Sequence, residues 1–401
     1  MALSQDYQLS VMMNHDKDTL PTPETAFVIN MENILSVTVT ESIITLLPKL
    51  EMTLTDNGGF LDLHPIMDKD VIHLTFNNDL GFEGNEVHAA FIISSFKAIS
   101  DSHGNTSNIF SLVGYLASHN TFAPFSRRAY TGSSDSVIRI ISNKMGLKFK
   151  NDISGVDNIT WHQNSNNYQF LKHVTSRSYI PNDGVFVYTS LNGTMNYTSY
   201  NIKNAMPPKF NAVLNRERVQ NPVLLPDDAL YMYYDSYDIL NVTEIYNNIS
   251  SYGGWYAYYN GTDYITEEID SYKETTDFVN RDISYDGLPV FSNNVGIVID
   301  KRLQNTIYKG KVQNEYLKYN IFSNTMALNI NTSTEVTLFD KVDLNLSSTL
   351  GDGIAEPYSG DYIVATITHN LMSQVGYAKR VLLCRGGINK NVSNYINPKV
   401  K

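Results

Sequence analysis

The sequence predicts a mainly β fold with an α+β insert, in which two β-rich regions flank a small helix-containing segment. Three observations support this prediction. Short runs rich in Val, Ile, Phe and Thr fill residues 1–118, apolar residues then recur with a helical period within 119–204, and strand-forming runs return in the last third of the chain. At 401 residues, the chain is long enough to form two or more domains.

The first region, 1–118, is predicted to be an antiparallel sandwich or barrel. Asn57-Gly58-Gly59 and His103-Gly104-Asn105 supply turns between its strands, and many short strands at this spacing are typical of both architectures. The runs that we expect to be strands are 24–31, 34–40, 49–55, 70–76, 86–94 and 109–116.

A first helix is predicted near 135–145. Val137, Ile138 and Ile141 form an apolar stripe with helical spacing, and the run before them offers a Ser or an Asp as the N-cap. Gly146 follows the stripe and is placed to end the helix. This helix belongs to the small α+β domain that we assign to 119–204.

A second helix and a β-hairpin complete that domain. The helical period starts at Asn167 and continues until Pro181-Asn182-Asp183-Gly184 breaks it. Two β runs, 185–190 and 194–200, are then separated by the turn signal Asn192-Gly193. The sequence therefore predicts a helix followed by a hairpin.

The rest of the chain is predicted to form a linker, a second barrel with an insertion, and a tail. Prolines mark 205–228 as a linker, whereas 263–305 is acidic and poorly periodic and indicates an insertion. The second barrel is expected to combine 229–262 with 306–386. Residues 387–401 form a polar C-terminal tail without packing signals.

The composition argues against several function classes. The net charge is −11, and no Lys/Arg run is longer than a pair such as Arg127-Arg128, so specific nucleic-acid binding is not expected. A single cysteine, Cys384, lies in an apolar run and is expected to be a core residue. The first residues lack a signal-peptide pattern, and no stretch approaches the roughly 18 apolar residues of a membrane span. Folding in a reducing cytoplasm, without a membrane, is therefore expected.

No constellation of residues predicts chemistry. The nine histidines are scattered without the i, i+4 spacing of a zinc protease, and a Gly-X-Ser-X-Gly motif is absent from the sequence. Adjacent acids such as Glu267-Glu268 are expected to be solvated loop residues, because neighbours on a strand point to opposite faces. We therefore predict no catalytic, cofactor-binding or metal-binding residue and expect the protein not to be an enzyme.

Three motifs occur in a characteristic order over about 130–386. The motifs are the helix run 132–141; Trp161-His162-Gln163 with 167–174 and 183–188; and the closing β-hairpin of 358–364, His369 and 381–383. Together they resemble the trimeric baseplate hub family of contractile phage tails, which is related to the hub portion of type VI secretion spike proteins.

The resemblance implies two antiparallel tube-like β-barrel domains flanking the helix-containing domain. It further implies a homotrimer that acts as a symmetry adaptor, since two barrels in each of three chains form a pseudo-six-fold ring. Such a hub joins the hexameric tail tube to the trimeric central spike around a channel through which DNA passes without specific binding. Other baseplate proteins and the tape measure protein are further expected partners. The expected location is the tail baseplate of a virion, assembled in the host cytoplasm.

A cluster of aromatic residues is the remaining functional signal. Tyrosine-rich surfaces are common at protein interfaces, and aromatic rings can also stack on sugars. Three interpretations stay open: a subunit interface, ordinary strand packing and a glycan platform. The last would make the protein a receptor- or glycan-binding protein of a virion surface. The candidate interface residues are Tyr233, Tyr234, Tyr246, Trp255, Tyr256 and Tyr258.

Overall fold

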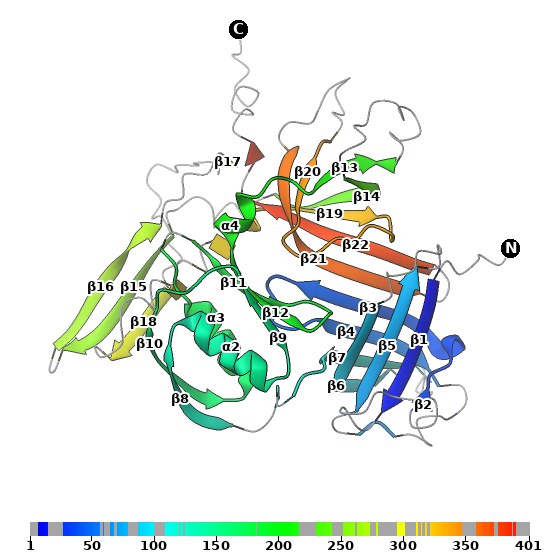
Figure 1. Ribbon diagram of the computed structural model, residues 1–401, viewed down its shortest axis with the longest axis horizontal. Coiled ribbons are helices and arrows are strands. Elements are labelled where there is room, and N and C mark those ends of the chain that lie inside the picture. The colour runs from blue at the N-terminus through cyan, green and yellow to red at the C-terminus, as the bar shows by residue number, and fades with distance from the viewer. Residues whose placement is uncertain are drawn as a thin grey trace, which may run out of the picture.

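The computed structural model confirms a mainly β fold with few helices (Figure 1). None of the helices in the described part of the chain combines the length and apolarity needed to cross a membrane. The residues that the structure describes are 7–14, 27–56, 59, 65–67, 70–78, 87–99, 109–119, 121–122, 125–181, 183–215, 230–242, 252–260, 263–272, 278–279, 295–300, 310–311, 314, 317–318, 321–346, 358–372, 376–386 and 388–389.

One sheet of 13 strands runs through both β regions, in the order β2-β1-β5-β6-β7-β4-β3-β21-β20-β13-β14-β19-β22. Its N-terminal strands are β1 Tyr7–Asn14, β2 Phe27–Val28, β3 Ile34–Ser42, β4 Lys49–Thr55, β5 Val71–Asn78, β6 Val87–Ile99 and β7 Ile109–Leu116. Its later strands are β13 Phe210–Leu214, β14 Tyr231–Val242, β19 Asn324–Ile330, β20 Lys341–Leu344, β21 Gly360–Met372 and β22 Gly376–Arg385.

The later strands form a closed barrel. The order β21-β20-β13-β14-β19-β22 returns to its start because β22 also pairs with β21. Its pairings are antiparallel except at β13, which is parallel to both β14 and β20. Alternate side chains point inward along each strand, and the core includes Met232, Leu328, Val342 and Leu383, all with 0% exposure.

The N-terminal strands form an antiparallel sheet that folds over a second core. Every pairing from β1 through β5, β6, β7 and β4 to β3 is antiparallel. Apolar residues alternate along β3 and β4 and pack against Leu74 and Phe91 from the opposite strands. The sheet then continues into the barrel, because β3 pairs with β21 over Ser36–Ser42 and Thr366–Met372. The two β regions are thus joined by a continuous ladder.

The helix-containing module, which we define as residues 125–204, lies beside both β regions in Figure 1. Two helices, α2 and α3, lie side by side and bury Val137, Ile141 and Val174 in a core shared with the N-terminal sheet. The elements are β8 Ser126–Gly132, α2 Ser134–Lys144, β9 Lys148–Asn151, β10 Ile159–Ser165, α3 Asn167–Arg177, β11 Val185–Thr189, β12 Thr194–Ser199 and α4 Tyr200–Asn204.

Local signals explain where these helices begin and end. The N-cap of α3 is Asn166, whose side chain accepts a hydrogen bond from Gln169 N at 2.8 Å. After α2, Gly146 adopts φ +72°, and Leu147 N donates to Ser142 O at 3.0 Å, which satisfies a carbonyl of the last turn. Both helices therefore match the predicted segments.

Besides the main sheet, the described residues form two small sheets in the helix-containing module, β10-β8 and β11-β12-β9, and two further sheets outside it. The arm sheet, as we name it, has the order β16-β15-β18 and is formed by β15 Tyr252–Asn260, β16 Asp263–Tyr272 and β18 Val295–Asp300. It extends away from the body in Figure 1, on the side of the helix-containing module. The short strands β17 Phe278–Val279 and β23 Ile388–Asn389 pair with each other. A 3-10 turn, η1, covers Met31–Asn33 before β3.

Several strands differ from the sequence-based expectations. β13 lies in the segment that we expected to be a linker, because its five residues between prolines are too few to show a period. β16 lies in the expected insertion, where acidic residues interrupt the apolar alternation. The strands β1 and β19 were not anticipated. The division into domains at particular residues stays a prediction.

Asn314 fastens the later part of the chain to the helix-containing module. It is in helical conformation and only 1% exposed. Its Oδ1 accepts a hydrogen bond from Val185 N at 3.0 Å, and its Nδ2 donates to Ser178 O at 2.8 Å. Gly310 lies nearby, and a Cβ there would be 2.6 Å from Arg177 O. This close approach leaves no room for a side chain.

We predict that Asn314→Ala destabilises the protein by about 3 kcal/mol, because it leaves a buried N–H and a buried carbonyl without this partner. Urea unfolding followed by circular dichroism measures the change, and the Val185 amide should lose protection from hydrogen exchange. The exposed Asn158 offers a control, since Asn158→Ala should change the unfolding free energy by less than about 0.5 kcal/mol. Equal stability of the two variants would contradict the proposed anchor.

Candidate functional site

Five of the six aromatic residues singled out from the sequence lie on two described strands that belong to different sheets. Tyr233 and Tyr234 lie on β14, where Tyr234 is 2% exposed within the barrel core and Tyr233 is half-buried. Trp255, Tyr256 and Tyr258 lie on β15, in the arm sheet, where the backbone alone is described. Tyr246 lies outside the described residues. Their role as an interface stays a proposal.

The exposed aromatic and apolar residues of β14 lie beyond the Tyr pair. Tyr237, Ile239 and Leu240 are 39%, 40% and 56% exposed, and the Tyr237 ring packs edge-on against Tyr234 with centroids 6.4 Å apart. β13 pairs with β14 only as far as Tyr234, so among the described residues this half of β14 has a partner, β19, on one side. The part of β14 that carries Tyr237, Ile239 and Leu240 is therefore more accessible than Tyr233 and Tyr234.

A buried cluster of ionisable residues lies where the three parts of the chain meet. We call Glu41, His369, Tyr377 and Lys379 the buried junction. Glu41 comes from β3, His369 from β21 and the other two from β22. Glu41, His369 and Lys379 are only 8%, 5% and 8% exposed. Strand pairing places them together, because β21 lies between β3 and β22.

Glu41 connects the β regions to the helix-containing module. Its Oε2 accepts a hydrogen bond from Leu191 N, 3.1 Å away, in the turn between β11 and β12. Burial raises the pKa of Glu41 to about 7, although the Leu191 amide and the positive charge of Lys379 both oppose this rise. Desolvation thus outweighs the favourable contacts, and the carboxyl group titrates near neutral pH.

His369 and Tyr377 share a hydrogen bond inside an aromatic contact. His369 Nδ1 and Tyr377 Oη are 2.7 Å apart, and the Phe76 ring of β5 lies 5.2 Å from His369 and 5.8 Å from Tyr377, centroid to centroid. Burial, with a smaller contribution from Lys379, lowers the pKa of His369 to about 3. The imidazole is therefore neutral at physiological pH and serves packing.

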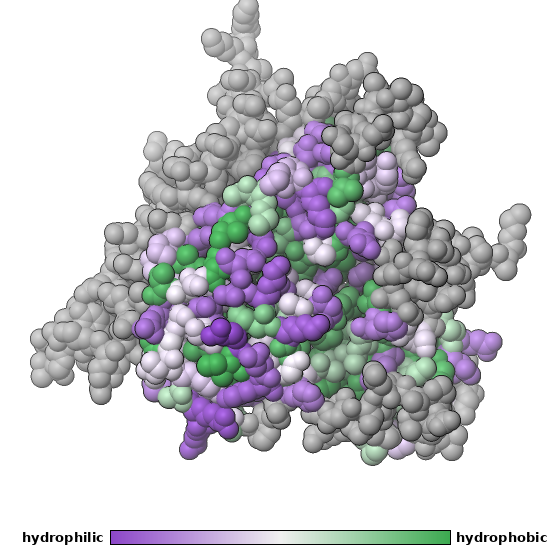
Figure 2. Space-filling view, in the orientation of Figure 1, coloured by the Kyte–Doolittle hydropathy of each residue, from purple (hydrophilic) through white to green (hydrophobic). Residues whose placement is uncertain are grey.

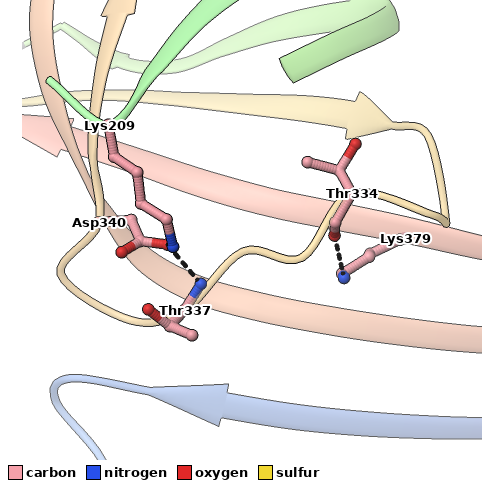
Figure 3. Close-up of polar contacts among 5 residues, drawn as sticks. All are labelled: Lys209, Thr334, Thr337, Asp340 and Lys379. Atoms are coloured by element: carbon pink, nitrogen blue, oxygen red, sulfur yellow. Dashed lines mark hydrogen bonds and ion pairs between the residues drawn. The ribbon is translucent and has the colours of Figure 1, made fainter. Parts of the chain in front are cut away.

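Lys379 holds the loop between β19 and β20 on the barrel. Its Nζ donates to Thr334 O at 2.7 Å, and burial lowers its pKa to about 8 despite the opposing effect of Glu41. Figure 3 shows this contact beside a second one, in which Asp340 Oδ2 accepts from Lys209 Nζ and from Thr337 N, both at 2.7 Å. The loop is thus attached at Thr334, through Lys379, and at Asp340, through Lys209.

The same loop packs against the helix-containing module. Phe339 has φ +68°, a backbone conformation that is rare for a bulky residue. Its ring lies 5.3 Å from Phe186 and 5.6 Å from Tyr188, centroid to centroid, both on β11. Val364 O of β21 accepts a hydrogen bond from Phe339 N at 2.9 Å. The unusual backbone conformation therefore accompanies a contact that joins barrel and module.

These contacts join the two β regions to the helix-containing module. Among the described residues, no group of three His, Cys, Asp or Glu side chains is arranged to hold a metal ion. Cys384 is fully buried, and burial raises the pKa of its thiol far above the usual range, so the predicted core role is confirmed. What the arrangement can do physically is fix the two β regions and the module relative to one another.

The sequence analysis missed the buried junction. Glu41 follows the alternating run of β3, and Lys379 stands at one position of an alternating β22, so each resembles an ordinary surface residue. A charged residue at an inward position of a strand was the available signal. The pairing of β3 with β21, which buries both, joins residues more than 300 positions apart and has no local signature.

The fold is that of phage tail proteins. The 43 kDa tail protein of prophage MuSo2 from Shewanella oneidensis matches with a TM-score of 0.53 and 10% identity, over 94% of this chain and 98% of that one. A tail protein from Neisseria meningitidis MC58 matches with a TM-score of 0.51 and 10% identity, over 95% and 98%. No protein-family model and no curated protein sequence matches the chain. The resemblance found in the sequence is thus confirmed at the level of the fold.

We predict that Glu41→Gln changes how stability depends on pH. Since the folded pKa of about 7 exceeds the ordinary 4.5, the stability that Glu41 contributes is full below pH 4.5 and is lost as the pH rises through 7. The free energy of unfolding of the variant, minus that of the wild type, should therefore rise by about 2–3 kcal/mol between pH 4.5 and 7.5. Urea unfolding at several pH values measures this difference.

The exposed Glu51 provides the control for that experiment, since it is 52% exposed and pairs with Lys49 on the surface. Glu51→Gln should follow the wild-type pH profile closely. His369 and Lys379 titrate in both the wild type and the variant. Subtracting the unfolding free energy of the wild type from that of the variant at each pH therefore removes most of their effect. A flat difference between Glu41→Gln and the wild type would show that Glu41 ionises normally.

Proposed function

We propose that this protein is a structural component of a phage tail, and more specifically a trimeric baseplate hub. In this role it joins the hexameric tail tube to the trimeric central spike around a channel for DNA. The observation that carries the proposal is the likeness of fold to two phage tail proteins over nearly the whole length of each chain. The ordered motifs of the sequence point to the same role.

The architecture suits a symmetry adaptor. Each chain contains a closed barrel and an N-terminal sheet, joined through β3 and β21 into a continuous ladder. Three copies would present six β units toward a six-fold tube while keeping three-fold symmetry toward a spike. Such a task requires the two units of one chain to hold a fixed relative orientation. The buried junction and the loop that carries Phe339 supply contacts of this kind.

The proposed role requires assembly rather than catalysis. Expected partners are the tail tube protein and the central spike protein, with other baseplate proteins and the tape measure protein as further candidates. DNA would pass through the channel without specific binding, and the chain's net charge of −11 supports weak affinity for phosphates. The corresponding location is the tail baseplate of a virion that assembles in the host cytoplasm.

We predict that the purified full-length protein forms trimers with an open centre. Native mass spectrometry measures the subunit number, and negative-stain images of the same sample reveal the ring. Addition of tail tube protein or spike protein should shift the trimer to a larger complex in size-exclusion chromatography.

A stable monomer that binds neither tube nor spike protein would contradict the hub. In that case the receptor- or glycan-binding alternative becomes the leading hypothesis. It predicts glycan-array binding that Trp255→Ala and Tyr256→Ala abolish, whereas a hub gives no signal on the array.

A further inference from the structure

The helix-containing module has the opposite charge to the rest of the chain. Residues 125–204 contain nine Lys and Arg residues, four Asp residues and no Glu, so their formal charge is +5 within a chain of net charge −11. The average composition conceals this contrast. Figure 2 shows hydrophilic side chains, in purple, interspersed with apolar ones over this face of the molecule. By formal charge, the module is thus a basic part of a protein that is acidic overall.

The acids of the module do not neutralise this charge. Asp157 is fully buried and accepts hydrogen bonds from Ser134 N and Tyr179 N, each at 2.8 Å. Asp183 and Asp135, at 7% and 9% exposure, also accept backbone N–H groups. The remaining acid, Asp152, pairs with Lys203 at 2.7 Å. The carboxylates are thus engaged inside the module or in its own ion pair.

Two of the module's exposed cations lie side by side in sequence on a strand edge. Arg127 and Arg128 are both exposed on β8, and neither forms an ion pair with another described residue. β8 pairs with β10 alone among the described strands, in a sheet of only two strands. Phe125, immediately before β8, is 74% exposed. A two-stranded sheet is marginal by itself, and a seven-residue edge is long enough to accept another strand.

The arm sheet presents a complementary edge. β16 pairs with β15 only, so it is an edge strand among the described residues. Its ten residues include Asp263, Glu267, Glu268 and Asp270 and contain no Lys or Arg. It is also the neighbour of β15, which carries the aromatic residues Trp255, Tyr256 and Tyr258. Within the described part of the chain, β8 is thus an edge strand with basic residues and β16 an edge strand with acidic residues.

Like charges restrict which edges can pair. Two copies of β8 would bring arginines together, and two copies of β16 would bring carboxylates together, and both arrangements are unfavourable. Pairing of β8 with β16 instead places opposite charges across the new ladder. Because the two edges are different surfaces, the contact between copies is head-to-tail, and such contacts form a closed ring of three when the rotation between copies is 120°.

We propose that β16 of one copy adds as a third strand to the β8–β10 sheet of a neighbouring copy. This inference rests on the trimer of the proposed function and specifies the surfaces that form it. Backbone hydrogen bonds supply much of the affinity, as in other cases of strand addition, and the charges select the partner edge. The occupant of the basic edge is thus the acidic arm of a second copy of this chain.

A charge-swap experiment tests the proposal on the full-length protein. The double variant Arg127→Glu/Arg128→Glu should weaken self-association about tenfold or more, as should Glu267→Lys/Glu268→Lys. A single chain that carries all four substitutions again has opposite charges across the ladder and should form the trimer. Native mass spectrometry and sedimentation at 0.05 M and about 0.5 M salt measure association, which should weaken as salt screens the charges.

The control reverses two exposed positive charges on the helices of the same module, Arg139→Glu/Lys172→Glu, and should leave the trimer unchanged. A trimer that is indifferent to Arg127→Glu/Arg128→Glu would overturn this interface and leave the hub intact. Failure of the four-residue swap to restore the trimer would also overturn it. A wild-type monomer would instead defeat the trimeric hub, and this interface with it.

Cross-linking gives a second measurement that does not depend on changing charges. Ala129 is exposed on β8, and Thr266 lies on β16, so Ala129→Cys/Thr266→Cys places one thiol on each edge. The natural Cys384 is fully buried and should not react. A short bismaleimide should join copies covalently in the double variant and not in either single variant at the same concentration. Trimers without such cross-links would overturn the proposal.

Discussion

The structure depends on one strand that belongs to two sheets at once. β21 pairs with β22 along one edge, while its other edge is divided between β20 near the start and β3 near the end. The division falls around Ala365, whose carbonyl accepts a hydrogen bond from Ile43 N at 2.9 Å, beside a register shift between Val364 and Thr366. A bend at this position lets one strand close the barrel and still continue into the N-terminal sheet.

The polar residues of the buried junction lie on this shared strand and its neighbours. Their burial costs solvation, as the shifted pKa values of Glu41, His369 and Lys379 record. Apolar side chains at these positions would be more stable, but they would tolerate several pairing registers of the strands. Here each polar group has a named partner in another part of the chain, so a slipped register would leave these groups unsatisfied. The buried junction therefore serves more to fix the pairing register of β3, β21 and β22 than to stabilise the fold.

Local physics accounts for what the sequence predicted. The first helix was predicted from its apolar stripe and the Gly146 stop, and the second from the helical period that starts at Asn167 and ends before Pro181. Strands with clear alternation, such as β3, β4 and β7, were found for the same reason. β13 and β19 could not be found, because β13 is too short to show a period and β19 is buried along most of its length. Glu41 and Lys379 became neighbours only through pairing across the whole chain.

The shared strand also has a consequence for how the protein folds during synthesis. Ser42 of β3 bonds with Thr366 of β21, 324 residues later, so the edge of β3 has no natural neighbour until almost the entire chain has left the ribosome. At a synthesis rate of roughly 5–20 residues per second, that interval lasts tens of seconds. A hydrophobic edge exposed for so long invites pairing with other nascent chains. The rate-limiting and most aggregation-prone stage of folding is therefore expected to be the docking of the last hairpin onto the first sheet.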